Sequence, residues 1–125
     1  MPRWQQDERA PGPIVQGFAG GGFSIDGHIY QAALLTPERA ESWTPPLLSD
    51  LTLQELEPLF SAGRMPEFLI LGTGPTMAFP PRTLVRDIES RGLGLEAMDS
   101  RAAARTWGML RGEGRWIAAA LMPLV

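Results

Sequence analysis

The stretch that most constrains the fold is residues 68–74, where the apolar run Phe-Leu-Ile-Leu ends in Gly-Thr-Gly. A short, continuous apolar run that glycines terminate is typical of a buried strand. Capped helices are predicted on both sides of it along the chain. The sequence therefore predicts a strand over 67–72 that lies in a mixed sheet with helices on its faces.

A capping box marks the start of the first predicted helix. The Thr52 hydroxyl can accept the Glu55 N–H group, and the Glu55 side chain can reach back to Thr52. Pro58 lies inside this helix, where a proline removes a hydrogen bond and clashes with the preceding turn. We therefore expect a tightened or kinked last turn that ends at Gly63.

Two further helices alternate with strands in the rest of the chain. Pro81 suits the first turn of the second helix, where a missing N–H group is tolerated, and Gly92 ends that helix. Asp99 or Ser100 caps the third helix, which runs to about Arg111. Strands are predicted over 94–98 and 115–125.

The first third of the chain is rich in strands. Phe23, Ile25 and Ile29 alternate with polar residues, which is the period of a half-buried strand. The pair Asp26-Gly27 interrupts this alternation. Both residues tolerate the positive φ that a two-residue turn needs, so the pair predicts an N-terminal β-hairpin.

A chain of 125 residues suits one domain. Residues 1–13 form a polar, proline-rich N-terminal arm that we expect to be flexible, and a single α/β domain is predicted over 14–125. No apolar stretch approaches the ~20 residues needed to span a bilayer. The arm also lacks the apolar core of a signal peptide, so we expect a cytoplasmic protein.

The missing residue types limit the chemistry. The sequence has no Cys and no Lys, and only one His (His28) and one Tyr (Tyr30). Cysteine and lysine nucleophiles are therefore excluded, and few acid–base groups remain at neutral pH. No second His can share a metal with His28, and a net charge of −3 argues against binding to nucleic acid. The sequence predicts no metal site and no cofactor.

The loop Gly72-Thr73-Gly74 is similar to the start of a nucleotide-binding loop, but its surroundings do not fit one. A dinucleotide fingerprint places a third small residue at position 77 and opens a helix directly on the glycines. Met77 occupies that position, and no helix can open before about Pro80. We interpret the glycines as a tight turn by which the strand leaves the sheet. The alternative is a small anion bound to the loop amides.

Side chains near this loop are candidates for a binding site. Asp99, at the end of its strand, is interpreted as a helix N-cap, the alternative being an acid or base at the mouth of a crevice. Arg101 and Arg105 are one helical turn apart and form either a solvated face or a docking surface for an acidic partner. Trp107 is expected in the core or at an interface.

Short motifs occur in a distinctive order in the second half of the chain. They are ILGTG at 70–74, FPP at 79–81, MDS at 98–100, RT at 105–106, LRGEGR at 110–115 and IAAAL at 117–121. Upstream, GFSIDG at 22–27 and the loop 43–45 extend the pattern. In this order the motifs resemble a small single-domain family that includes mitochondrial complex I assembly factor three and the adipogenesis-associated protein of animals.

The third predicted helix departs from that family. Where the family commonly has Cys-Arg-Thr-Tyr-Asn, this chain has Ala-Arg-Thr-Trp-Gly over 104–108, so cysteine chemistry is not available and the aromatic residue is kept as Trp107. The resemblance implies a three-layer α/β domain with a central mixed sheet of about five strands, the last antiparallel to its neighbours. It implies no established catalysis.

The resemblance also implies a helper that binds early peripheral-arm subunits of respiratory complex I near the membrane. Our leading hypothesis is a non-catalytic interaction or assembly factor, whose working surface combines the loop Gly72-Thr73-Gly74 with Arg105, Thr106 and Trp107. The alternative is a small-molecule- or anion-binding protein or enzyme, in which this loop, Asp99 and Arg105 line a crevice beyond the parallel strands. A third hypothesis is self-association as a homo-oligomer.

Overall fold

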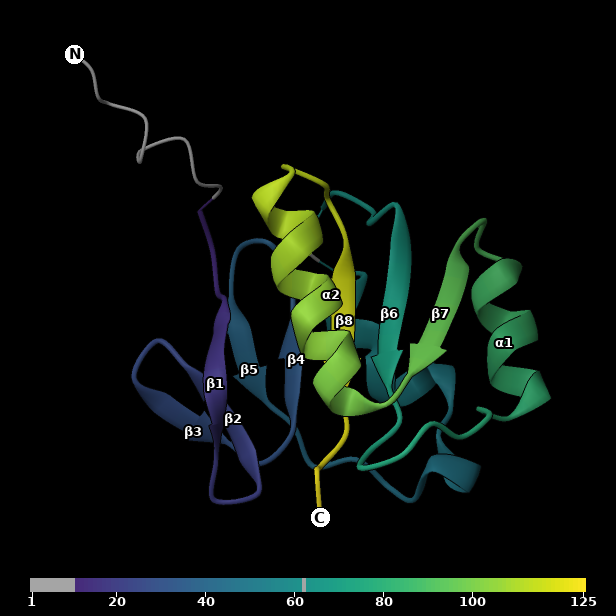
Figure 1. Ribbon diagram of the computed structural model, residues 1–125. Coiled ribbons are helices and arrows are strands. Elements are labelled where there is room, and N and C mark those ends of the chain that lie inside the picture. Colours follow the sequence, from purple (N-terminus) through teal and green to yellow (C-terminus); the bar gives the residue numbers. More distant parts are fainter. Residues whose placement is uncertain (1–10, 62) are drawn as a thin grey trace.

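The structure is a computed structural model that describes residues 11–61 and 63–125. Its strands are β1 (Val15–Ala19), β2 (Gly22–Ile25), β3 (His28–Tyr30), β4 (Ala33–Leu35), β5 (Ala40–Ser42), β6 (Phe68–Gly72), β7 (Gly94–Met98) and β8 (Ala118–Leu121). They form a three-stranded sheet in the order β1-β2-β3 and a five-stranded sheet in the order β5-β4-β8-β6-β7 (Figure 1). The predicted fold class, a five-stranded mixed sheet with an N-terminal hairpin and three helices, is confirmed.

The N-terminal hairpin forms where the sequence predicts it. β2 and β3 pair antiparallel, and Asp26 and Gly27 between them have φ values of 51° and 83°. Positive φ at both turn residues matches the twist of the two strands. A second turn with positive φ, at Gly20 and Gly21, adds β1 to the hairpin as a third strand.

The direction of the last strand differs from the expectation. β8 is antiparallel to β4 but parallel to β6, so the expectation that it runs antiparallel to its neighbours is wrong on the β6 side. The reason lies in helix α2 (Ser100–Gly112), which joins β7 to β8. This crossover carries the chain back along the sheet, so that β7, β6 and β8 all run in one direction.

The three predicted helices are η3 (Leu53–Leu59), α1 (Arg82–Glu89) and α2, and a short turn η2 (Leu48–Asp50) precedes η3. η3 is a 3₁₀-helix over its whole length, whereas the sequence predicted tightening only in the last turn. In an α-helix the Pro58 ring would clash with the Gln54 carbonyl group. The predicted capping box is present. Its hydrogen bonds from the Thr52 hydroxyl and then the Thr52 N–H group lower the pKa of the Glu55 carboxyl.

Helices and the small sheet enclose the five-stranded sheet on its two faces. Along β4, β6 and β8, successive side chains point to opposite faces, as the pleat of a strand requires. One face packs on α2 and the three-stranded sheet through Leu35, Ile70, Ala119 and Leu121. The other face packs on η3 and α1 through Leu34, Leu69, Leu71, Ala118 and Ala120.

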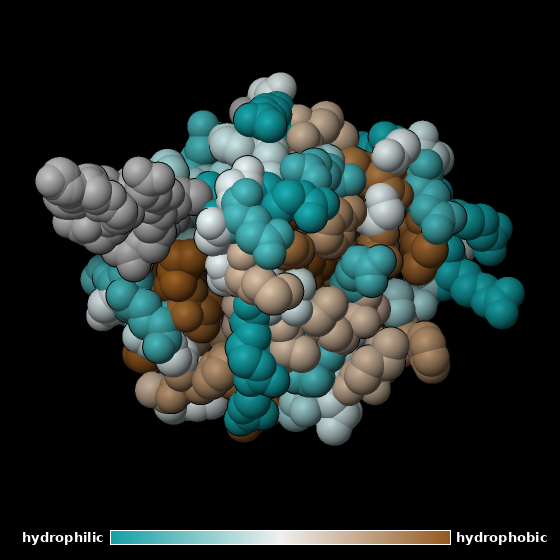
Figure 2. Space-filling view, turned by 45° about the horizontal axis from the view of Figure 1, so that its top comes forward, coloured by the Kyte–Doolittle hydropathy of each residue, from teal (hydrophilic) through white to brown (hydrophobic). Residues whose placement is uncertain are grey.

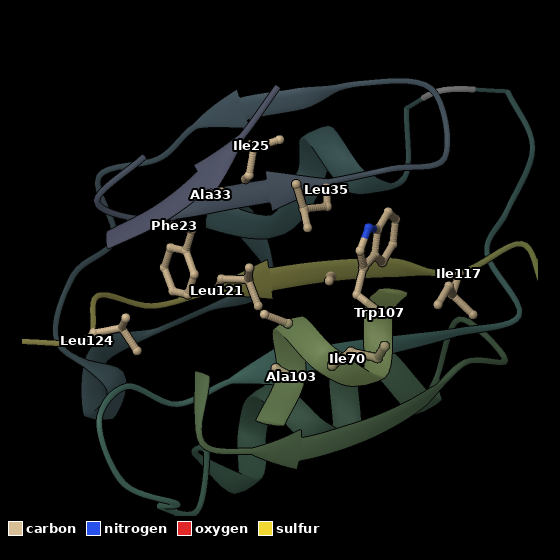
Figure 3. Packing of buried hydrophobic residues seen from close by; sticks show 12 residues of the cluster. Phe23, Ile25, Ala33, Leu35, Ile70, Ala103, Trp107, Ile117, Leu121 and Leu124 are labelled. Carbon is tan, nitrogen blue, oxygen red and sulfur yellow. The ribbon is translucent and has the colours of Figure 1, made fainter. Parts of the chain in front are cut away.

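Trp107 is the largest side chain of the first core cluster. Its indole lies between α2 and the strands, among Leu35 and Ile117 (Figure 3), and it is 0% exposed. Its Nε1–H group donates to the Pro13 carbonyl oxygen at 2.9 Å, and an indole N–H that is buried needs such a partner. The last residues of the predicted N-terminal arm are therefore held against α2, while residues 1–10 lie outside the described residues.

A second side chain of α2 holds the same N-terminal segment. Arg111 is buried, and this burial lowers its pKa. Its Nη2 donates to the Pro11 carbonyl oxygen at 3.0 Å and its Nη1 to the Arg115 carbonyl oxygen at 2.6 Å. The carboxyl-terminal half of α2 thus forms hydrogen bonds both to the N-terminal segment and to the residue Arg115 that follows the helix.

The role of Trp107 in the core can be tested by truncation. Trp107→Ala should lower the free energy of unfolding by about 3–5 kcal/mol, because it removes a fully buried aromatic side chain and leaves a cavity. Met109→Ala is the matched control on the same helix, since Met109 is 60% exposed, and should change stability by less than about 0.5 kcal/mol. Urea denaturation of both variants measures the difference, and equal effects would contradict this packing.

Candidate functional site

The loop after β6 lies against the start of α2. Gly72, the last residue of β6, is buried, and a Cβ atom at this position would lie 2.7 Å from Ser100 Oγ and 2.9 Å from Ser100 Cα. Gly74 has a φ of 112°, which side chains rarely allow. The two glycines therefore permit a close approach and a sharp turn, and the interpretation of this stretch as a tight turn out of the sheet is confirmed.

The Ser100 hydroxyl joins three segments of the chain. It accepts the Gly74 N–H group at 2.8 Å and donates to the Met122 carbonyl oxygen at 2.8 Å, beyond the end of β8. The Ser100 N–H group donates back to the Gly74 carbonyl oxygen at 2.8 Å. We call this set of contacts the Ser100 node. Its polar groups are buried, and each of these bonds satisfies a donor or acceptor that water cannot reach.

The loop amides that were candidates for anion binding are used inside the protein. The Thr73 N–H group donates to the Met98 carbonyl oxygen at 2.8 Å, and the Gly74 N–H group belongs to the Ser100 node. The Thr73 hydroxyl donates to the Thr76 carbonyl oxygen at 2.8 Å and accepts the Ala78 N–H group at 3.1 Å. An anion at this loop would have to replace these bonds.

Asp99 caps α2. Its Oδ1 accepts the Ala102 N–H group at 2.9 Å, and its backbone is extended, with φ of −62° and ψ of 159°. This is the geometry of an N-cap, which satisfies one of the free donors of the first helical turn. The N-cap interpretation of Asp99 is confirmed, and this carboxylate is hydrogen-bonded to the first turn of its own helix.

A crevice opens at the carboxyl ends of β6 and β8, which lie at the lower edge of Figure 1 together with the C-terminus. Its volume is about 260 Å³. Almost every lining side chain is apolar, and none is charged. The lining residues are Pro45, Pro46, Leu47, Leu48, Thr73, Gly74, Pro75, Met122, Pro123 and Val125.

Sequence reasoning placed a crevice beyond the parallel strands but missed most of its lining. The loop 45–48 and the C-terminal residues 122–125 contribute most of it. The available signal was the sequence Pro-Pro-Leu-Leu over 45–48, whose apolar residues follow no helical or strand period. Leu47 is 73% exposed, so the crevice carries a protruding hydrophobic residue at its rim.

The three α2 residues of the predicted working surface lie in three different settings. Arg105 is exposed and lines a separate groove of about 190 Å³ with residues 15–18 of β1 and Ala104. Thr106 is half-buried, with Oγ1 3.4 Å from Met98 Sδ. Trp107 is buried in the core. The structure thus brings Thr73 and Gly74 to the crevice, whereas Gly72 is buried against Ser100. It places Arg105 in another groove and buries Trp107 away from the surface.

Arg101, which the sequence places one helical turn before Arg105, lies beside the same groove, which we call the β1 groove. Its guanidinium carbon lies 5.7 Å from the centre of the Phe18 ring, within the range of a cation–π contact. Arg101 and Arg105 both line the side of α2 that faces β1. Arg101 and Arg105 therefore lie on the same side of α2, and neither of them lines the crevice.

Within 11–61 and 63–125, no group of three His, Cys, Asp or Glu side chains could hold a metal ion. None of the helices found in these ranges combines the length and the apolar character that crossing a membrane requires.

The close approach at Gly72 makes a specific prediction. Gly72→Ala should lower the free energy of unfolding by about 1–3 kcal/mol, because the new methyl group overlaps the Ser100 backbone. Gly108→Ala is the control within α2, where a Cβ atom would meet no atom within 4 Å. It should stabilise the protein by about 0.5–1 kcal/mol through helix propensity. Thermal and urea denaturation measure both changes, and a neutral Gly72→Ala would contradict the packing at the Ser100 node.

Comparison with known proteins places the chain among relatives of the same architecture. Residues 15–122 match the family described as "Protein of unknown function (DUF498/DUF598)". An uncharacterized protein of Rhodobacter capsulatus is 31% identical over 111 residues, which are 88% of this chain and 84% of that protein. The "NADH dehydrogenase (ubiquinone) 1 alpha subcomplex assembly factor 3" of Danio rerio is 27% identical over 119 residues, which are 94% of this chain and 68% of that protein.

A solved structure supports the same assignment. The crystal structure of a protein from Bordetella parapertussis superposes with a TM-score of 0.81 at 31% sequence identity, covering 90% of this chain and 97% of that one. The matched region, residues 15–122, includes every strand from β1 to β8 in full. The chain therefore belongs to the DUF498/DUF598 family of proteins of unknown function.

Proposed function

We propose that the chain is a non-catalytic interaction protein that assists the assembly of a membrane-associated respiratory complex, with complex I as the first candidate. The similarity to an assembly factor of NADH dehydrogenase over 94% of the chain supports this class of partner. The proposed place of action is the cytoplasm at the inner face of the membrane.

The observation that carries the proposal is the chemistry of the crevice. Its lining is apolar, its one hydroxyl, that of Thr73, is bonded within the loop, and Leu47 protrudes at its rim. Exposed hydrophobic residues that gather around a depression are a common mark of a protein interaction site. The crevice therefore favours contact with an apolar surface of another protein.

Figure 2 views the molecule with the amino ends of β6 and β8 tilted toward the reader. In Figure 2, hydrophilic side chains are interspersed among hydrophobic ones over this face. Such mixing is ordinary for a solvated surface. The exposed Arg105 in the β1 groove would be a second contact for an acidic part of the same partner.

The small-molecule alternative has less support. The crevice is smaller than the roughly 300–1,000 Å³ usual for ligand pockets. The loop amides and the Asp99 carboxylate that would recognise a polar ligand are bonded inside the protein, and Arg105 lies in another groove. Self-association through the crevice is the remaining alternative, which the mass of the chain in solution tests.

The test is affinity purification of the tagged chain from native cells with gently solubilised membranes, read by quantitative mass spectrometry. Wild-type protein should enrich subunits of the respiratory complex. Leu47→Glu should reduce this enrichment about tenfold or more, because it places a charge on the apolar contact. Arg105→Glu should weaken it less, since a charge at the rim contributes less than the buried centre of an interface.

Met65→Glu is the matched control for Leu47→Glu. Met65 is also an exposed hydrophobic residue, and it precedes the amino end of β6 and therefore lies away from the crevice. This variant should retain the wild-type enrichment. Absence of respiratory subunits from the wild-type preparation, or equal loss in both variants, would contradict the proposal.

A further inference from the structure

A second, larger hollow lies on the other side of the loop that follows β6. Its volume is about 750 Å³, and its lining consists of Phe79, Pro80, Arg82, Val85 and Arg86. We call it the α1 groove, because α1 supplies three of these residues. α1 lies beside β7 at the edge of the five-stranded sheet (Figure 1). The α1 groove is separate from the crevice, which the same loop lines with residues 73–75.

Phe79 is a preorganised hydrophobic anchor. Its side chain is 85% exposed, which is unusual for a residue of this size. Pro80 and Pro81 follow it directly, and a proline restricts both its own backbone and that of the preceding residue. The backbone around Phe79 is therefore already restricted before a partner binds, and this reduces the entropy lost on association.

Arg82 and Arg86 give the α1 groove its charge. They are exposed and one helical turn apart on α1, so their guanidinium groups reach the same side of the helix. Within the described ranges, no carboxylate lies within 4.0 Å of either guanidinium group. Asp87 and Glu89 are exposed on the same helix but pair with neither arginine. The nearby Arg91, by contrast, pairs with Glu57 at 2.7 Å. Two arginines beside an apolar groove are complementary to a ligand with both acidic and apolar groups.

We infer that the α1 groove binds a short linear segment of a protein partner, with an apolar side chain packed on Phe79 and Val85 and acidic side chains paired with Arg82 and Arg86. A concave groove suits a peptide, since a flat bilayer cannot reach its base. This inference goes beyond the proposed function, because it assigns a peptide site that is independent of the respiratory partner.

The probe is a phage-displayed library of 12-residue peptides, selected on the purified full chain. The selected peptides should carry two or more acidic residues near a large apolar residue. Synthetic copies, measured by fluorescence polarisation, should lose about tenfold or more in affinity with Phe79→Ala and with Arg82→Glu/Arg86→Glu. The affinity for the double variant should also stop falling with added salt, because the paired charges are gone.

Arg101→Glu/Arg105→Glu is the matched control, with the same residue type at the same helical spacing on α2. It should bind the peptides as the wild type does, and so should Leu47→Glu, which separates this test from that of the proposed function. All of the replaced side chains are exposed, and thermal denaturation confirms that each variant is folded.

Three outcomes would overturn the inference. They are a selection that yields no peptide, peptides that bind Phe79→Ala and Arg82→Glu/Arg86→Glu as tightly as the wild type, and binding to vesicles of anionic phospholipid without binding to any peptide.

Discussion

The contact between Gly72 and Ser100 is the constraint on which the rest of the structure depends. Because Gly72 has no side chain, the first turn of α2 can lie directly on the end of β6. The Ser100 hydroxyl then bonds the loop after β6 and the chain beyond β8 at the same time. One buried side chain thus fixes the start of a helix, the exit of one central strand and the exit of its neighbour.

This contact also determines what the carboxyl edge of the sheet can bind. Open α/β sheets usually hold ligands at that edge, where loop amides point at the ligand. Here the amides of Thr73 and Gly74 point into the protein instead, and Asp99 bonds its own helix. What remains at the edge is an apolar surface formed by the loop 45–48 and the chain end 122–125. A shape typical of a ligand-binding crevice is therefore combined with the chemistry of a protein contact.

Local patterns in the sequence predicted most of the fold. The apolar run before Gly72, the Asp26-Gly27 turn and the Asp99 cap each depend on neighbouring residues, and each was predicted correctly. The features that the sequence did not reveal depend on residues far apart in the chain. Ser100 lies 26 residues from Gly74, and Trp107 donates to a carbonyl 94 residues away.

The same limit applied to the candidate site. The turn at the Gly72 loop could be predicted because glycines specify it locally, whereas the crevice is built from three separated segments. The amphipathic pattern of α2 could not show whether Trp107 is a surface or a core residue, because its burial depends on strands and on the N-terminal segment that packs over it. The direction of β8 likewise depends on how α2 crosses the sheet.

The central claim is that the carboxyl-end crevice contacts a partner protein in the cell. The most direct measurement replaces Leu47 with a photoreactive benzoylphenylalanine, irradiates intact native cells and identifies the crosslinked proteins by mass spectrometry. The same residue introduced at Met65 is the control. We expect crosslinks from position 47 to a subunit of a respiratory complex and none to that subunit from position 65. The absence of any protein crosslink at position 47, or the same products from both positions, would contradict it.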